Sequence, residues 1–364
     1  MKIGILTFHR AENFGAVLQC FALQTYLEAI GNDVKIIDYR CKAIEQVYYL
    51  LNPKSLLNRL NLFASIYNYL IRLSSYRDRY EKKRGYIDFR NKYLHQTKSM
   101  HKIDEDLGFD VYITGSDQVW NPALLHGYDK TYFLDFPVSP GSKRISYAVS
   151  SDQSGINVLN KFENELRPSL QQIDYISVRE ENLANALAKY TSKKIQICID
   201  PTFLISREQY LKMAIRPCEK KYILVYHMAE IPEGSKCADL LAKKNKWIVI
   251  EVHANFARRK DNYRHRQNVG PLELLGYIAY AEYIITSSFH GLAFSLIMHK
   301  NFCTVSNKKN VRLANLLNFV GLNDRMIESA INIPESDIDY NSVDEKISEY
   351  VSQSKNFLSK ALKQ

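Results

Sequence analysis

The chain opens with Lys2-Ile3-Gly4-Ile5-Leu6-Thr7, an apolar run that predicts a buried β-strand. Apolar residues at helical spacing follow over residues 15–27 and stop near Gly31-Asn32. Val34-Lys35-Ile36-Ile37-Asp38-Tyr39 then returns to the pattern of a strand. A strand, a helix and a second strand in this order make a βαβ unit, in which the strands run parallel. This opening segment therefore predicts an α/β fold.

The same alternation starts again after the middle of the chain. A strand pattern at residues 222–226 is followed by a helical pattern and then by another strand pattern. A length of 364 residues also predicts two domains, at ~100 to 200 residues each. We therefore expect two Rossmann-like domains, residues 1–205 and 206–340, and a final helix over 341–364 that packs back on the first domain.

The composition is that of a globular protein. Hydrophobic residues make up 46% of the chain and charged residues 24%, close to the averages for soluble domains. No run approaches the ~20 apolar residues that a membrane span needs, and Ala11-Glu12-Asn13 interrupts the apolar start that a secretion signal requires. We expect the protein to act in the cytoplasm.

The six cysteines are scattered along the chain. They form no Cys-x-x-Cys pair, and no histidine stands at a spacing typical of zinc ligands. We expect buried, reduced thiols and neither a metal ion nor a cofactor. The cysteines are Cys20, Cys41, Cys198, Cys218, Cys237 and Cys303.

The net charge of +10 favours an anionic partner. A phosphorylated small molecule, a nucleic acid and a membrane surface would all satisfy it. The basic residues are spread out and no nucleic-acid module is recognisable, so nucleic acid is not expected.

A helical insertion over about residues 50–100 departs from the βα pattern of the first domain. Apolar and aromatic residues dominate 55–73, and the basic stretch Arg77-Asp78-Arg79-Tyr80-Glu81-Lys82-Lys83-Arg84 follows. This combination is typical of an amphipathic helix on an anionic membrane surface, which would place the protein at the inner face of the cytoplasmic membrane. The alternative is a helix packed on its own domain with a solvated charged face.

The most informative turn is Thr286-Ser287-Ser288-Phe289-His290-Gly291, which lies between a predicted strand and a predicted helix. The first turn of a helix presents backbone N–H groups and the positive end of the helix dipole, so it binds anions. In open α/β sheets, ligands bind where the strands end. His290 is therefore the first candidate for catalysis, and the alternative is a capping turn with a packed histidine.

Two further charged residues stand at predicted strand ends. Asp117 follows a strand in a Gly-Ser-Asp turn, where its carboxylate would take a proton from a hydroxyl or would only cap a helix. Arg179 ends another strand, where its guanidinium would bind a carboxylate or phosphate or would pair with Glu180 or another nearby acid. Asp200, before a proline, is interpreted mainly as a turn residue.

Taken together, these segments resemble the polysaccharide pyruvyl transferase family. Their order and spacing carry the resemblance more than any single motif does. The segments are Asn13-Phe14-Gly15-Ala16-Val17-Leu18-Gln19, residues 114–121, Ser177-Val178-Arg179-Glu180, Asp200-Pro201-Thr202 and Ser287-Ser288-Phe289-His290-Gly291.

The resemblance implies a GT-B-like fold, with two Rossmann-like domains that face each other across a cleft. It implies transfer of a pyruvyl group from phosphoenolpyruvate to a sugar of a cell-surface polysaccharide or its lipid-linked precursor, which forms a pyruvate ketal. His290 and Arg179 stand at positions that the family associates with the donor. Many members have arginine two residues before that histidine, where this chain has Ser288.

Within that scheme we assign His290 as the acid, because its unperturbed pKa is near physiological pH, and Asp117 as the base. Arg179 and the turn residues Ser287, Ser288 and Gly291 would bind the donor, and no metal is needed since arginine and backbone dipoles supply the positive field.

The acceptor is expected on the first domain. Asn13 and Gln19 can donate to and accept from sugar hydroxyls, and Gly15 allows a close approach to the backbone. The alternative for this segment is a simple βα turn.

Two other functions fit the same residues. A GT-B glycosyltransferase would place the diphosphate of a nucleotide sugar at the late helix. A non-catalytic anion-binding protein of an envelope-assembly complex would keep the cleft for binding alone.

Overall fold

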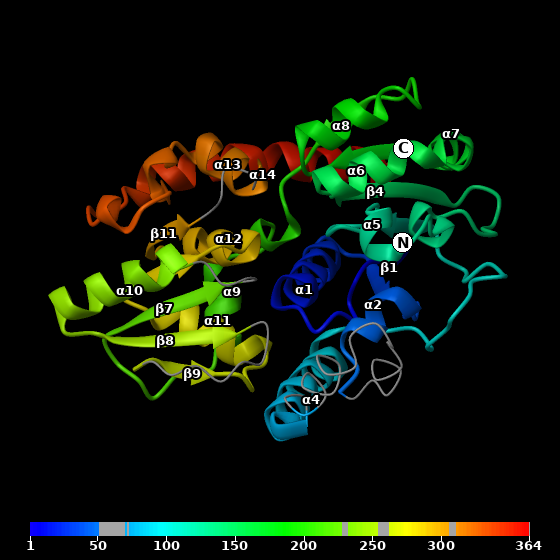
Figure 1. Cartoon of the computed structure of the whole chain (residues 1–364). Helices are drawn as coiled ribbons and strands as arrows, with labels where there is room; N and C mark the ends of the chain where they lie inside the picture. The colour runs from blue at the N-terminus through cyan, green and yellow to red at the C-terminus, as the bar shows by residue number, and fades with distance from the viewer. Residues whose placement is uncertain (51–69, 71–72, 228–231, 254–261, 306–310, 364) are drawn as a thin grey trace. The chain divides into compact units, whose positions relative to one another are not determined.

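The computed structural model describes residues 1–50, 70, 73–227, 232–253, 262–305 and 311–363 (Figure 1). The chain forms two compact units. The first unit comprises Met1–Tyr48, Arg90–Ile205 and Ile347–Gln364, and the second comprises Tyr49–Phe89 and Ser206–Lys346.

The first unit is built on a six-stranded sheet in which every strand pairs in parallel with its neighbour. The spatial order is β2-β1-β3-β4-β5-β6, so the order reverses between β1 and β3. The strands are β1 (Lys2–Leu6), β2 (Asp33–Ile36), β3 (Val111–Thr114), β4 (Lys143–Val149), β5 (Tyr175–Val178) and β6 (Ile195–Ile197).

Helices connect these strands, as parallel pairing requires. The first, α1, is Phe14–Ala29, and its N-terminus is capped by the side chain of Asn13, which accepts a hydrogen bond from the N–H of Ala16. The others in this unit are α2 (Lys42–Val47), α5 (Pro122–Leu125), α6 (Gln153–Leu159), α7 (Glu163–Gln172) and α8 (Glu181–Leu187), with the short 3₁₀ segments η3 (Lys130–Phe133), η4 (Asn160–Phe162) and η5 (Pro201–Phe203).

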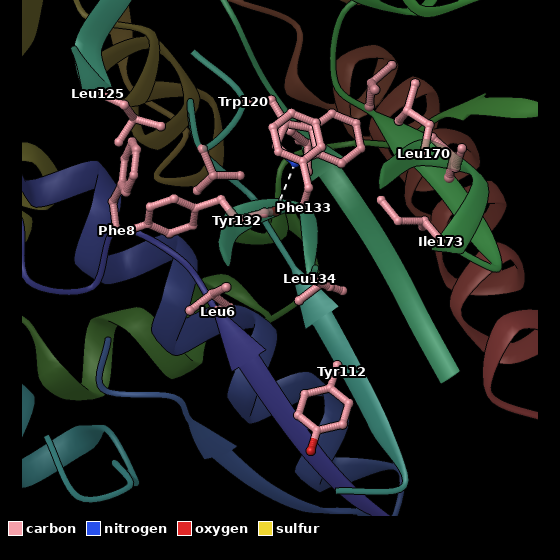
Figure 2. Close-up of a cluster of buried hydrophobic side chains, with 14 of the residues drawn as sticks. Leu6, Phe8, Tyr112, Trp120, Leu125, Tyr132, Phe133, Leu134, Leu170 and Ile173 are labelled. Atoms are coloured by element: carbon pink, nitrogen blue, oxygen red, sulfur yellow. Dashed lines mark hydrogen bonds between the residues drawn. The ribbon is translucent and has the colours of Figure 1, made fainter. Parts of the chain in front are cut away.

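A buried aromatic cluster fills one side of the first sheet (Figure 2). The rings of Trp120 and Phe133 are stacked with centroids 4.7 Å apart, and Trp120 donates its indole N–H to the carbonyl oxygen of Tyr132 at 2.9 Å. Phe8 meets the edge of the Tyr132 ring at 5.1 Å. This packing fixes the segment that follows β3 against the end of β1.

The second unit has another six-stranded parallel sheet, with the order β12-β11-β10-β7-β8-β9. Counted from β7, this is the 3-2-1-4-5-6 order of dinucleotide-binding folds, and it reverses between β7 and β10. The strands are β7 (Tyr222–His227), β8 (Ile248–His253), β9 (Arg264–Arg266), β10 (Tyr283–Thr286), β11 (Asn301–Val305) and β12 (Met326–Ile327).

The helices of this unit flank its sheet in Figure 1. They are α9 (Arg207–Met213), α10 (Pro232–Asn245), α11 (Pro271–Tyr280), α12 (Phe289–Ile297) and α13 (Val311–Val320), with η6 (Asn323–Arg325) and η7 (Ala330–Asn332). Two longer helices, α4 (Tyr76–Tyr93) and α14 (Tyr340–Lys363), each begin in the second unit and end in the first.

The expected α/β class with two Rossmann-like domains is confirmed by these two sheets. The chain passes from the first unit to the second between Ile205 and Ser206. The helical insertion is placed differently from the expectation, since residues 49–89 group with the second unit. Part of the reason is that Glu81 of α4 accepts a hydrogen bond from Asn268 at 2.7 Å. Residues 51–69 and 71–72 of the insertion lie outside the described residues.

All six cysteines are free thiols. Five are buried as expected, and the expectation was wrong for Cys218, which is exposed beside Glu219. Within the described ranges, no helix is both long and apolar enough to cross a bilayer.

The last part of α14 packs on the first unit through polar and apolar contacts. The hydroxyl of Ser354 accepts a hydrogen bond from the N–H of Ile199 at 2.9 Å, with both residues buried. Lys143 donates to the carbonyl oxygens of Ala361 and Leu362. The helix therefore satisfies backbone groups that would otherwise be buried without a partner.

Replacing Ser354 with alanine is expected to lower the free energy of unfolding by about 1–3 kcal/mol, because it leaves the N–H of Ile199 buried without an acceptor. The matched control is Ser352→Ala on the same helix, where the serine is exposed and the change should be within ~0.5 kcal/mol. Urea unfolding followed by circular dichroism measures both. Equal midpoints for the two variants would contradict this reading.

Candidate functional site

Each sheet has one place where the strand order reverses, and in open α/β sheets this is where ligands bind, beyond the carboxyl ends of the strands. In the first unit this place lies between β1 and β3, and in the second between β7 and β10. The sequence candidates fall at or near both places. Asp117 follows β3, and His290 stands in the first turn of the helix that follows β10.

At the reversal point of the first sheet, a set of side chains ties the end of β1 to the turn after β3. The Thr7 hydroxyl donates to the carbonyl oxygen of Ser116 at 3.1 Å, and the amide of Gln19 donates to the Thr7 hydroxyl at 2.9 Å. Gln19 also donates to the carbonyl oxygen of Ala16. Because Gln19 is fully buried and both of its N–H groups are used, it holds this turn together.

Asp117 lies on the turn itself, with φ of 70°. This left-handed conformation is uncommon for a residue other than glycine and often marks a functional turn. Its carboxylate accepts from the N–H of Gln118 at 2.8 Å, and its carbonyl oxygen accepts from the N–H of Ser150 at 2.9 Å. The side chain is partly exposed, so it remains accessible to a ligand.

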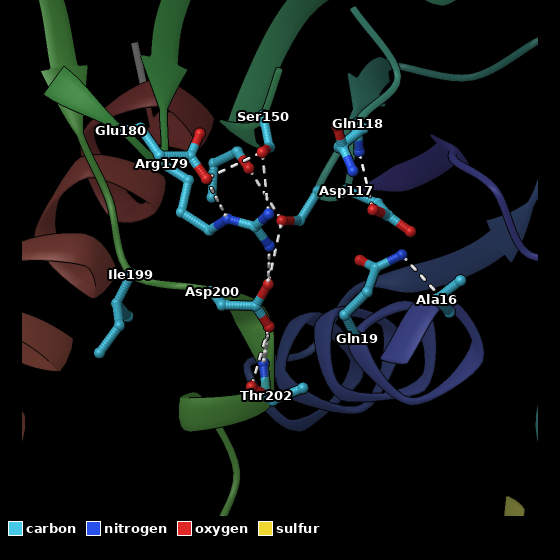
Figure 3. A network of polar contacts seen from close by, with 12 residues as sticks. Ala16, Gln19, Asp117, Gln118, Ser150, Arg179, Glu180, Ile199, Asp200 and Thr202 are labelled. Atoms are coloured by element: carbon cyan, nitrogen blue, oxygen red, sulfur yellow. Dashed lines mark hydrogen bonds and ion pairs between the residues drawn. The ribbon is translucent and has the colours of Figure 1, made fainter. Parts of the chain in front are cut away.

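Beside it, the guanidinium of Arg179 lies at the centre of a buried polar network (Figure 3). Its Nε donates to Glu180 at 2.8 Å, its Nη1 to Asp200 at 2.6 Å and its Nη2 to the Ser150 hydroxyl at 2.8 Å. The hydroxyl of Ser150 in turn donates to Glu180 at 2.8 Å. The ends of β4, β5 and β6 are thus held together by one cation and its acceptors.

The charges of this network do not cancel. Burial alone would lower the pKa of Arg179, but the carboxylates of Glu180, Asp200 and Asp117 raise it above its ordinary value. One permanent cation therefore faces three acids. The alternative that the sequence left open, pairing of Arg179 with a nearby acid, is what the structure shows, and direct binding of the donor by Arg179 stays a prediction.

The two carboxylate oxygens of Asp200 have different partners. One carboxylate oxygen accepts from the backbone N–H and hydroxyl of Thr202, at 3.0 and 2.8 Å, which caps η5 as a turn residue would. The other oxygen accepts from Arg179. The turn expected from the sequence is present, and the ion pair is added to it.

Replacing Arg179 with methionine is expected to lower the free energy of unfolding by about 3–5 kcal/mol, because it leaves buried carboxylates without their cation. Arg167→Met is the matched control, since Arg167 forms an exposed pair with Glu163 worth at most about 1 kcal/mol. Urea unfolding of both variants tests this. Adding Asp200→Asn should recover part of the loss, and an Arg179→Met protein as stable as the control would refute the buried ion-pair centre.

In the second unit, the turn after β10 is organised by two hydroxyl groups, those of Thr286 and Ser288. Ser288 caps α12 by accepting from the N–H of Gly291 at 3.3 Å, and its own N–H donates to the Thr286 hydroxyl at 3.1 Å. The Thr286 hydroxyl donates to the carbonyl oxygen of Tyr226 at 2.6 Å. The end of β7 and the start of α12 are therefore linked at the reversal point of this sheet.

Tyr226 was not singled out from the sequence, yet it lines this same turn. Burial raises the pKa of Tyr226 to about 12, and a hydrogen bond with Ser288 acts in the opposite direction. The phenol is therefore neutral at physiological pH and can serve as a hydrogen-bond donor. Its position at the end of a strand pattern was the only available signal.

His290 is the second residue of α12 and is buried, with 8% of its surface exposed. Its ring meets the edge of the Phe289 ring at 5.2 Å. The capping turn named as the alternative is present, because Ser288 is the cap. A capping turn and a catalytic histidine are compatible, because His290 belongs to the helix itself whereas the cap, Ser288, is the residue just before the helix begins.

Gly291 is required by close packing between α12 and β10. A Cβ atom at this position would lie 2.2 Å from the Thr286 hydroxyl oxygen and 3.0 Å from the Tyr226 ring. Its N–H is already bonded to Ser288. The glycine therefore sets the distance of the helix from the strand.

Gly291→Ala should destabilise the second unit by about 1–3 kcal/mol, because the methyl group overlaps the Thr286 side chain. Thr286→Ala removes the nearest overlapping atom, so the double variant should lose less stability than the sum of the two single variants. Thermal unfolding of the three proteins gives the comparison. Additive losses would show that the overlap does not determine the effect.

The remaining predicted residues have clear positions. Asn13 caps α1, Gly15 is buried in its first turn, and Ser287 is half-buried between β10 and the cap. Their binding roles stay predictions. The residues that the sequence did not indicate are mainly Thr7, Ser116 and Ser150, each a small hydroxyl residue just beyond a strand end.

A second charged cluster follows β1 and β2 in the first unit. His9 is fully buried, with Nδ1 3.1 Å from the carbonyl oxygen of Thr7 and Nε2 2.9 Å from Asp38. Arg10 pairs with the same carboxylate. Burial alone would raise the pKa of Asp38, but the hydrogen bonds from His9 and Arg10 lower it well below its usual range.

A sequence model of the polysaccharide pyruvyl transferase family matches residues 13–309. The match runs from before β2 to beyond β11 and includes Asp117, Arg179 and His290. This chain belongs to the polysaccharide pyruvyl transferase family. No curated protein matches the sequence significantly.

Several solved structures resemble this family member over nearly their whole length, at low identity. The UDP-GlcNAc 2-epimerase of Methanocaldococcus jannaschii shares 13% identity, with 97% of this chain and 92% of that chain covered and a TM-score of 0.45. The UDP-N-acetylglucosamine 2-epimerase of Rickettsia bellii shares 11% identity, with 100% of this chain and 96% of that chain covered and a TM-score of 0.47. The Escherichia coli heptosyltransferase WaaC with ADP shares 12% identity, with 96% of this chain and 100% of that chain covered and a TM-score of 0.37.

The described part of the chain contains no group of three or more His, Cys, Asp or Glu side chains arranged to hold a metal ion.

Proposed function

We propose that this transferase moves a pyruvyl group from phosphoenolpyruvate to a sugar of a cell-surface polysaccharide or its lipid-linked precursor, and forms a pyruvate ketal. The observation that carries the proposal is the family match over residues 13–309. The position of His290 at the reversal point of the second sheet supports it.

The donor is proposed to bind at the N-terminus of α12, on the second unit. Phosphoenolpyruvate carries a carboxylate and a phosphate, and a helix N-terminus attracts such anions through its N–H groups and dipole. The first unit is less suited to a polyanion around Arg179, because three carboxylates surround that guanidinium. We therefore assign the second unit to the donor and the first to the acceptor.

The reaction requires one acid and one base. A proton is delivered to C3 of phosphoenolpyruvate, C2 becomes cationic, and a sugar hydroxyl attacks C2. The C2–O bond to phosphate then breaks, phosphate leaves, and a second hydroxyl of the sugar attacks C2 to close the ketal. Two hydroxyl protons are released, one proton is taken up at C3, and the other leaves with phosphate.

His290 is assigned as the acid and Asp117 as the base. Among the three carboxylates near Arg179, Glu180 and Asp200 are buried and bonded to the guanidinium, whereas Asp117 is partly exposed. A base must reach the proton that it removes, so accessibility favours Asp117. Donor binding by Arg179, which the resemblance implied, is not part of this scheme. Arg179 is instead a positioning residue, because its bonds hold Glu180 and Asp200 in place beside Asp117.

His290→Asn is expected to lower turnover with phosphoenolpyruvate by about 10² to 10⁴-fold, because it removes the proton donor. The control is His101→Asn, which changes an exposed histidine of the first unit and should retain full activity. Circular dichroism of both variants checks the fold. Full activity in His290→Asn would exclude the histidine from catalysis.

The donor is identified by thermal-shift titration with phosphoenolpyruvate, UDP, GDP and inorganic phosphate. Selective stabilisation by phosphoenolpyruvate is expected, by about 2.7 kcal/mol at a concentration one hundred times the dissociation constant. Selective stabilisation by a nucleotide would instead support a glycosyltransferase that uses a nucleotide sugar. A lack of any response would favour a non-catalytic envelope protein.

A further inference from the structure

Helix α4 has two different faces. Tyr86 and Phe89 are buried at 3% and 2% exposure, so one side of the helix packs on the protein. The opposite side presents Tyr76, Tyr80 and Ile87, which are 40%, 51% and 37% exposed. These three residues recur at helical spacing and form one stripe.

Two arginines lie beside this stripe on the helix. The side chains of Arg77 and Arg84 are 90% and 72% exposed. Each forms an i,i+4 pair, with Glu81 at 3.0 Å and with Asp88 at 3.6 Å. Exposed pairs of this kind are weak, so both guanidinium groups can exchange these partners for others. We call Tyr76, Arg77, Tyr80, Arg84 and Ile87 the docking face.

The neighbouring sequence adds positive charge. Between Tyr76 and Arg84 the helix has five basic residues and two acidic ones, a net charge of 5 − 2 = +3. Leu70 and Leu73, just before the helix, are exposed at 57% and 52%. Large apolar side chains and excess positive charge therefore occur on one short stretch of surface.

The aromatic residues have the chemistry of a bilayer interface. The rings of Tyr76 and Tyr80 are stacked at 6.4 Å between centroids. Tyrosine combines an apolar ring with a polar hydroxyl and is enriched at the level of lipid headgroups. Arginine beside it can pair with phosphate while its methylene groups stay on the apolar side.

We propose that the docking face binds the surface of an anionic phospholipid bilayer. The choice of a bilayer over a protein partner rests on charge complementarity and on exposed aromatic side chains beside basic ones on one helix, because anionic lipids attract basic residues and tyrosine is enriched at the level of the headgroups. This inference is independent of the proposed reaction. The proposal adds to the reaction the place where the enzyme would act, which is the surface of a bilayer.

The test is co-sedimentation of the full chain with vesicles of phosphatidylcholine alone and with vesicles that also contain phosphatidylglycerol. Binding is expected only to the anionic vesicles, and raising the salt concentration should release the protein. The vesicles contain no sugar acceptor, so the result does not depend on catalysis. Equal binding to both vesicle types, or no binding to either, would overturn the proposal.

Two variants test the face itself. Arg77→Gln together with Arg84→Gln should weaken binding by roughly 25-fold, at about fivefold for each arginine near the surface. Tyr76→Gln together with Tyr80→Gln should weaken it by on the order of tenfold, because it removes aromatic area from the interface.

The matched control is Leu240→Gln together with Ile331→Gln, which changes two apolar residues of the same unit that are 52% and 90% exposed but lie on other elements. This variant should bind as the unchanged protein does. Equal losses in the control and in the tyrosine variant would assign the effect to general surface hydrophobicity and reject the docking face.

Discussion

Every paired strand in the described sheets runs parallel to its neighbours, and this constraint decides where polar side chains gather. Parallel strands end at one edge, so turns that are far apart in the sequence meet there. The turns after β3, β4, β5 and β6 come from four separate segments, yet they meet around Arg179. The chemistry of each unit therefore follows from the direction of its strands.

Within the first unit, a buried cation organises the site and leaves an excess of negative charge. Arg179 holds Glu180 and Asp200 in the interior, and the charge of Asp117 also raises the pKa of Arg179. A buried ion pair of this kind contributes little net stability, but breaking it is costly. The ion-pair network fixes the ends of β4, β5 and β6 relative to one another. This keeps the partly exposed carboxylate of Asp117 in position.

The second unit differs from the first, because the N-terminus of α12, and not a charged side chain, lies at its reversal point. The hydroxyl groups of Thr286 and Ser288, together with Gly291, bring α12 close to β7 and β10. The arrangement leaves the positive end of the helix dipole beside His290, which suits an anionic ligand. Ser288, two residues before His290, is used as the cap of this helix.

The sequence alone predicted the α/β class and several of its strands and helices in their order, because apolar spacing indicates which face of a strand or helix is buried. It predicted the βαβ start, the second sheet, the closing helix and the turns that carry Asp117, Arg179 and His290. Only the tertiary structure showed that Arg179 is shared between Glu180, Asp200 and Ser150, that Gln19 is an interior residue, and that α4 exposes a basic aromatic face. Hydrogen-bond partners and exposure depend on segments that are distant in the chain, so local patterns do not contain them.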